Sequence, residues 1–172
     1  MMQDLRKKTL NIAYSTNLNY LSVTLVSMYS LLKNGKGDCD LNLMLAVEND
    51  VRQEDLSPFY RMLSGFPDCT LAVRWPERMV PYRFASDHTA CLSADAVQSA
   101  CFRLLLTELF DKEERCLYLD SDTLVLAPVT DVYDTAMNGC LMAGVTDRLC
   151  LEAHHRDRCY RDWGIAAGYY IN

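Results

Sequence analysis

The chain has 172 residues, of which 50% are hydrophobic and 23% are charged. This composition is typical of one globular domain with a full core, and it excludes an intrinsically disordered chain. The formal net charge of −6 argues against nucleic acid as a partner, because duplex binding needs a broad basic face. No apolar run reaches the roughly 20 residues of a transmembrane helix, since residues 21–32 are interrupted by serine and threonine.

Hydrophobic periodicity predicts strands that alternate with helices. Short apolar or alternating runs predict strands at residues 10–14, 41–47, 70–75 and 115–119. Repeats of three and four predict helices at residues 21–32, 50–63 and 96–110, the second of them opened by a capping box of Asp50 and Gln53. Strands separated by helices indicate an α/β fold with a mainly parallel central sheet.

Cysteine usage bears on the cellular compartment. Eight cysteines are many for this length, but none forms the C-x-x-C pairs of zinc or redox sites. Most lie in apolar stretches, where we interpret them as buried free thiols. The N-terminal residues lack the long apolar segment and cleavage site of a signal peptide. We therefore expect a reduced, cytoplasmic protein.

Two aspartates, Asp120 and Asp122, directly follow the last predicted strand. Open α/β sheets bind ligands at the carboxyl ends of their strands, and residues two apart in an extended chain face the same side. Uncompensated carboxylates there are costly, so a divalent cation between them is a simple interpretation, and oxygen ligands suit Mg²⁺ or Mn²⁺. The apolar run 124–126 is expected to continue the sheet beyond this point. The alternative is a plain turn with Asx caps.

Residues 117–125, Leu-Tyr-Leu-Asp-Ser-Asp-Thr-Leu-Val, resemble the metal-binding DxD segment of glycosyltransferase family 8, which comprises retaining enzymes of the nucleotide-sugar GT-A fold. Three other stretches agree in order. Residues 11–32 resemble the family's first strand and helix, with a base-contacting turn that ends in Asn-Tyr. Residues 99–110 resemble the helix whose arginine reaches the donor, and residues 164–172 resemble the approach to the Tyr-Phe-Asn-Ala-Gly motif.

The resemblance implies a donor, an acceptor and a set of site residues. The donor is a UDP-hexose, and the acceptor is a saccharide or lipid-linked saccharide of lipopolysaccharide or another surface glycan. Asp120 and Asp122 would hold Mn²⁺ or Mg²⁺ against the diphosphate. The implied nucleotide-sugar contacts are Ser15, Asn17, Asn19, Tyr20 and Arg103, with Tyr20 stacked on the base. The residues implied on the donor-sugar side are Asp147 and Asn172.

Several of these residues also have a purely structural interpretation. Asn19 and Tyr20 fit a helix cap and staple, Arg103 fits a surface ion pair, and Asp147 fits a loop cap. The family turn carries Asp-Asp before Asn-Tyr, whereas this chain has Asn17 at the first of these positions. Its amide oxygen can still accept a hydrogen bond from a uracil N–H.

The chain ends at Asn172, inside the last matched motif. We therefore expect a single, incomplete GT-A domain over residues 1–172, truncated at its C-terminal side, with self-association through the apolar flank left exposed. The leading hypothesis is a retaining hexosyltransferase, either free in the cytoplasm or peripheral to the inner face of the bacterial membrane. An inactive nucleotide-sugar-binding module is the second hypothesis. A metal-dependent nucleotidyltransferase ranks last, because residues 15–19 contain neither glycine nor lysine.

Overall fold

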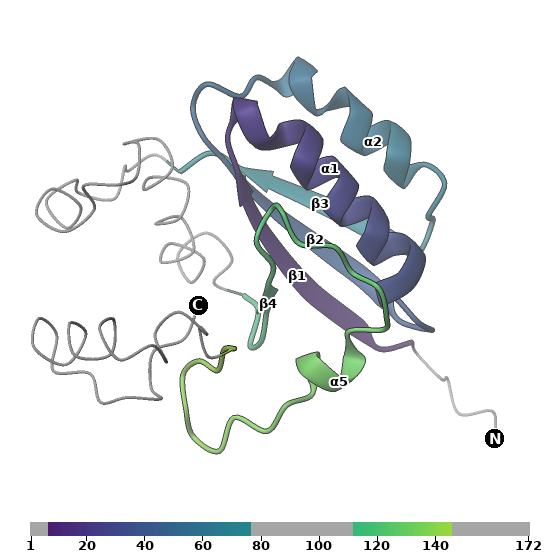
Figure 1. Ribbon diagram of the computed structural model, residues 1–172, viewed down its shortest axis with the longest axis vertical. Coiled ribbons are helices and arrows are strands. Elements are labelled where there is room, and N and C mark those ends of the chain that lie inside the picture. The colour runs from purple at the N-terminus through teal and green to yellow at the C-terminus, as the bar shows by residue number, and fades with distance from the viewer. Residues whose placement is uncertain (1–6, 77–111, 146–172) are drawn as a thin grey trace, which may run out of the picture. The chain divides into compact units, whose positions relative to one another are not determined.

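The computed structural model in Figure 1 describes residues 7–76 and 112–145. The chain divides into two compact units, Met1–Asp134 and Thr135–Asn172. The described part of the second unit, residues 135–145, consists of turns and irregular chain. That the 172 residues form one incomplete domain stays a prediction.

A parallel sheet of four strands forms the centre of the first unit, in the order β3-β2-β1-β4. The strands are β1 (Thr9–Thr16), β2 (Asp40–Val47), β3 (Cys69–Arg74) and β4 (Leu117–Tyr118). β1 and β2 pair in parallel along their whole length, and Ile12 of β1 pairs with Leu117 of β4 on its other side. The predicted α/β class with a parallel sheet is confirmed.

Helices follow β1 and β2 as the periodicity predicts, whereas the helix predicted at residues 96–110 lies outside the described residues. A 3-10 turn (Leu18–Tyr20) leads into α1 (Leu21–Ser30), which ends in a π-helical turn (Leu31–Gly35). A second 3-10 turn (Gln53–Leu56) leads into α2 (Ser57–Leu63), and α5 (Thr130–Tyr133) is one short turn of helix. Both α1 and α2 lie on one face of the sheet (Figure 1). Within the described ranges, no helix is long and apolar enough to cross a membrane.

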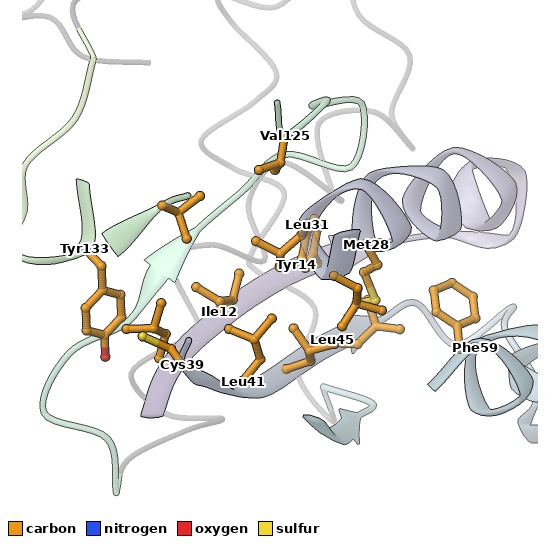
Figure 2. Close-up of a cluster of buried hydrophobic side chains, with 14 of the residues drawn as sticks. Ile12, Tyr14, Met28, Leu31, Cys39, Leu41, Leu45, Phe59, Val125 and Tyr133 are labelled. Carbon is orange, nitrogen blue, oxygen red and sulfur yellow. The ribbon is translucent and has the colours of Figure 1, made fainter. Parts of the chain in front are cut away.

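The core lies between the sheet and these helices (Figure 2). Alternate residues of β1 and β2 point into the core, and α1, its π-helical turn and α2 add apolar side chains from the helix layer. The fully buried members include Ile12, Tyr14, Leu41, Leu45, Met28, Leu31 and Phe59. Burial of each large apolar side chain contributes about 1.5–3 kcal/mol. Val125 and Tyr133, far along the chain, complete the same cluster. They attach the segment after β4 to the first half of the sheet.

The boundaries differ from prediction at several places, among them β4, which covers only Leu117–Tyr118 of the strand predicted at residues 115–119. β1 extends through Ser15 and Thr16, two residues beyond the strand predicted at residues 10–14, because both pair with β2. The second helical segment begins two residues late: the backbone N–H of Arg52 donates to Asp55 Oδ2 at 2.9 Å, and this pair forms the capping box that was expected at residues 50 and 53.

The expectation that residues 124–126 continue the sheet is wrong. They form irregular chain, with Leu124 and Leu126 exposed and Val125 buried. The backbone groups of Val125 bond to helix side chains instead of a strand: its N–H donates to Ser30 Oγ (2.9 Å) and its carbonyl accepts from Asn34 Nδ2 (2.8 Å). Buried backbone groups need hydrogen-bond partners. Because the side chains of Ser30 and Asn34 supply these partners for Val125, residues 124–126 do not need to pair with the sheet.

The cysteines in the described ranges are free thiols, as predicted, but they are not uniformly buried. Cys39 lies in the core and Cys69 is half-buried, whereas Cys116 and Cys140 are exposed. An apolar local sequence therefore did not predict burial for each thiol.

Candidate functional site

Two functional segments predicted from sequence meet at one edge of the sheet. β1 ends in Ser15 and Thr16, and Asp120 follows β4 after Leu119. The two strands are parallel neighbours, and their pairing extends one residue further, since the N–H of Leu119 donates to the carbonyl of Ala13 at 3.0 Å. The carboxyl ends of β1 and β4 therefore lie side by side, which is where open α/β sheets bind ligands.

Asp120 and Asp122 lie in a tight turn and not in an extended strand. The carbonyl oxygen of Asp120 accepts two hydrogen bonds from Thr123, one from its N–H (3.1 Å) and one from its hydroxyl (2.8 Å). Asp120 is half-buried and Asp122 is exposed. The backbone here is the Asp-Ser-Asp turn of the alternative prediction and not an extended strand in which residues two apart share a face. A turn still presents both carboxylates at the sheet edge.

The middle residue of this turn attaches it to β1. Ser121 is buried, and its hydroxyl donates to the carbonyl oxygen of Ser15 at 2.6 Å. The same hydroxyl lies 2.9 Å from Thr24 Oγ1 on α1. β1 and α1 thus both hold Ser121 in place. Asp120 and Asp122, its neighbours in the chain, are thereby kept close to β1 and α1.

Thr24 is the centre of a buried polar network beneath the site. Its one hydroxyl proton goes to Ser121 Oγ, since Ser121 donates its own to Ser15. The Tyr20 carbonyl oxygen and Thr16 Oγ1 lie 2.9 Å and 2.8 Å from the same hydroxyl. One turn on, Ser27 Oγ lies 3.0 Å from Thr123 Oγ1. Because a buried polar group without a partner is costly, these contacts make α1 a specific docking surface for the chain that follows β4.

The sequence contains a signal for this network that the predictions above do not include. Thr24, Ser27 and Ser30 are three residues apart and so lie along one side of a helix. They were considered only as interruptions of an apolar run. Hydroxyls at helical spacing within a buried face indicate a polar contact with another element. This pattern could have predicted that Thr24, Ser27 and Ser30 bond to a neighbouring segment.

The predicted base-binding turn has both buried and exposed members. Asn17 is buried and its Oδ1 accepts the N–H of Tyr20 at 3.1 Å, so Asn17 and not Asn19 is the N-cap. Ser15 is buried as well, with its Oγ 2.8 Å from the hydroxyl of Tyr118. Asn19 and Tyr20 are exposed, Tyr20 by 48%. The turn thus offers one accessible aromatic ring, that of Tyr20, next to two buried residues whose side chains form hydrogen bonds.

Three predicted site residues, Arg103, Asp147 and Asn172, lie outside the described residues. Of the predicted site, the structure brings together the end of β1, the Asn17–Tyr20 turn and the Asp120–Asp122 turn. The roles of all these residues stay predictions.

The donor set at the aspartate turn fits a hard divalent cation in kind. Carboxylate oxygens are the ligands that Mg²⁺ and Mn²⁺ prefer, and such ions commonly keep positions open for phosphate and water. Among the residues that the structure describes, no group of three or more His, Cys, Asp or Glu side chains could enclose a metal. Asp120 and Asp122 could therefore supply only part of a coordination shell.

The chain is similar to known glycosyltransferases. The family model "Glycosyl transferase family 8" matches residues 11–164. A lipopolysaccharide 1,2-glucosyltransferase of Escherichia coli (strain K12) is 29% identical over 141 residues, which are 80% of this chain and 38% of that protein. The chain thus spans less than half the length of this curated relative.

Solved structures agree on the fold. Galactosyltransferase LgtC, in complex with donor and acceptor sugar analogs, matches with a TM-score of 0.74 at 19% identity, over 95% of this chain and 55% of that one. The bifunctional glycosyltransferase WbbM matches with a TM-score of 0.63 at 19% identity, over 86% of this chain and 25% of that one. The predicted GT-A fold is confirmed. With the match of the family model over most of its length, the chain belongs to glycosyl transferase family 8.

Proposed function

We propose that this chain binds a UDP-sugar and takes part in transfer of its hexose, with retention, to a saccharide or lipid-linked saccharide of lipopolysaccharide or another surface glycan. Membership of the family supports transfer of a sugar, and the E. coli relative is named as a glucosyltransferase of lipopolysaccharide. The observation that carries the proposal is the junction of two turns at one sheet edge, where Ser121 bonds to Ser15.

We propose that Asp120 and Asp122 hold Mn²⁺ or Mg²⁺ at this junction. Their carboxylates lie at the carboxyl edge of the sheet, and their oxygen chemistry suits either ion. A bound cation would offset the negative charge that develops on the diphosphate leaving group. The remaining ligands would come from the diphosphate, water or residues outside the described ranges.

The exposed ring of Tyr20 would stack on the base, and Asn19 beside it would hydrogen-bond the base edge. Asn17 and Ser15, both buried, would contribute by shaping the turn and by any acceptor capacity they retain toward the nucleotide. The proposed roles of Arg103 at the donor and of Asp147 and Asn172 on the donor-sugar side complete the set.

The first test is binding of nucleotides by isothermal titration calorimetry, with Mn²⁺ and with EDTA. We expect UDP and UDP-hexoses to bind with metal and to bind much more weakly in EDTA. Absence of UDP binding in Mn²⁺ would contradict the proposal. Preference for a nucleoside triphosphate, with release of pyrophosphate, would favour a nucleotidyltransferase instead. Tight binding of UDP-hexose with neither hydrolysis nor transfer would favour a binding module.

We also propose a reducing, cytoplasmic location, at least in part at the inner face of the membrane where lipid-linked acceptors are reached. The four free thiols in the described ranges support a reducing compartment. Cell fractionation with thiol labelling tests this: oxidised thiols or recovery from an extracytoplasmic fraction would contradict it.

Self-association is a further part of the proposal. Leu124 and Leu126, directly after the aspartate turn, are 61% and 77% exposed, and adjacent exposed apolar side chains favour contact with another surface. Light scattering on the purified chain should detect dimers or larger species that the Leu124→Ser, Leu126→Ser double variant reduces. A strictly monomeric wild type would contradict self-association.

A further inference from the structure

One buried hydroxyl, that of Thr24, contacts both segments that are proposed to bind the donor. It donates to Ser121 Oγ at 2.9 Å, because the proton of Ser121 itself goes to Ser15, and Ser121 stands between the two proposed metal ligands. It also lies 2.9 Å from the carbonyl oxygen of Tyr20, which belongs to the proposed base-binding turn. The side chain of Thr24 is fully buried, so any effect on a ligand must pass through these neighbours.

The hydroxyl of Ser121 carries the connection to the aspartates. It bonds to β1 through the Ser15 carbonyl (2.6 Å) and contacts α1 through Thr24. Each aspartate is one peptide away from Ser121, so an anchor at Ser121 restricts the backbone of both. On the other side, the Tyr20 carbonyl belongs to the residue whose N–H is capped by Asn17. The network thus runs from one turn to the other through a single side chain.

We propose that Thr24 is a positioning residue, which ties the base-binding turn to the aspartate turn and so holds the metal ligands in place for a bound nucleotide. This inference rests on the function proposed above. Removal of the hydroxyl takes away the buried donor of Ser121 Oγ and the contact with the Tyr20 carbonyl. Partners that orient metal ligands from outside the coordination shell change metal affinity by about 10–100-fold when they are removed.

The test compares three variants of the full chain. Thr24→Val keeps nearly the same shape without the hydroxyl, and Thr24→Ser restores the hydroxyl. Ser30→Ala is the matched control, because Ser30 is also buried on α1 and its Oγ also holds the chain after β4, through the N–H of Val125 (2.9 Å). That contact lies beyond the aspartate turn, so its loss should lower stability without loosening the turn.

Binding of Mn²⁺ in the presence of saturating UDP is measured from the electron paramagnetic resonance signal of free Mn²⁺. We expect Thr24→Val to weaken Mn²⁺ binding by about tenfold. We expect Thr24→Ser to restore it and Ser30→Ala to leave it unchanged. Thermal unfolding of the same samples shows whether Thr24→Val and Ser30→Ala lose comparable stability.

Hydrogen exchange provides a readout that needs no ligand. In Thr24→Val the backbone amides of residues 119–123 should exchange faster than in wild type, whereas Ser30→Ala should affect residues 124–126 only. Equal loss of Mn²⁺ affinity in both variants, or unchanged affinity and exchange in Thr24→Val, overturns the inference. If wild type binds Mn²⁺ with UDP and Thr24→Val binds it equally well, only this inference fails. If the wild-type chain binds neither Mn²⁺ nor UDP, the proposed function fails, and this inference fails with it.

Discussion

The hydroxyl of Ser121 donates a hydrogen bond of 2.6 Å to the carbonyl oxygen of Ser15, 106 residues earlier in the chain. This bond joins the turn after β4 to the end of β1, one of the two inner strands of the described sheet. As a result, an exposed aromatic ring at Tyr20 and two carboxylates at Asp120 and Asp122 belong to one edge of the fold. A nucleotide needs a surface for its base and a cation for its phosphates. The ring is a candidate for the first, and the carboxylates are candidate ligands of the second.

The carboxylates can be tested by isosteric substitution. We expect Asp120→Asn and Asp122→Asn each to weaken Mn²⁺ binding in the presence of UDP by at least about tenfold, because each removes a charged oxygen ligand. Asp50→Asn is the control: Asp50 is exposed in the loop after β2, at the same edge, and the charge change is identical. Calorimetry in Mn²⁺ measures the effect. Equal affinities for Asp122→Asn and Asp50→Asn would contradict a direct role for Asp122.

Substitutions of Tyr20 and Asn17 should affect different properties: Tyr20→Ala the affinity for UDP, and Asn17→Ala the free energy of unfolding. Loss of a stacked base costs about 1–3 kcal/mol, so Tyr20→Ala should weaken UDP binding by about 5- to 150-fold. Since the ring is 48% exposed, the free energy of unfolding should change little. Asn17→Ala removes the cap on the Tyr20 N–H and should lower stability by about 1 kcal/mol. Urea unfolding and UDP titration of both variants check this; a Tyr20→Ala variant with full UDP affinity would refute base stacking.

Gly35 allows a test of how the segment after the site packs on the core. A Cβ at this position would lie 2.7 Å from Leu31 Cδ1 and 2.8 Å from Val125 Cγ1. Leu31 can rotate, but the branched side chain of Val125 is stiff, so Gly35→Ala should destabilise the fold by about 1–3 kcal/mol. Gly65→Ala is the control, because its nearest contact, the carbonyl oxygen of Met62, would be 3.6 Å away. Equal urea midpoints for the two variants would show that Val125 is not packed as described.

Tyr14 predicts how stability changes in alkaline solution. Burial raises the pKa of its hydroxyl from 10.0 to about 12, and a bond to Ser27 opposes this shift. The phenol therefore stays protonated in the native state while the unfolded chain ionises it. Its contribution to stability is complete below pH 10 and is lost as the pH rises toward 12. Tyr14→Phe lacks this loss, so the variant should gain stability relative to wild type between pH 10 and 12.

The measurement is urea unfolding of wild type and Tyr14→Phe at pH 7 and across the alkaline range. At pH 7 the two should be close, within about 1 kcal/mol, because the 3.5 Å contact with Ser27 is long for a hydrogen bond. A constant difference from pH 7 to pH 12 would show that Tyr14 ionises equally in both states.

The sequence by itself determined the order of strands and helices in the described ranges, the parallel α/β class and the position of Asp120 and Asp122 after a strand. Each of these depends on local periodicity or on residue types within a short window. Leu41, Leu43 and Leu45 alternate and form β2, with their side chains in the core. The family resemblance likewise depended on short ordered segments, and the match over residues 11–164 confirmed it.

Only the tertiary structure decided which polar groups pair across the chain. Residues 124–126 have the pattern of a strand, yet Ser30 and Asn34 satisfy the backbone of Val125 and no strand forms. The hydroxyl of Thr24 meets that of Ser121 across 97 residues, a pairing that no local pattern encodes. A hydrogen-bond partner is chosen by which atoms the packed core brings within about 3 Å, and that choice exists only after the strands and helices have assembled.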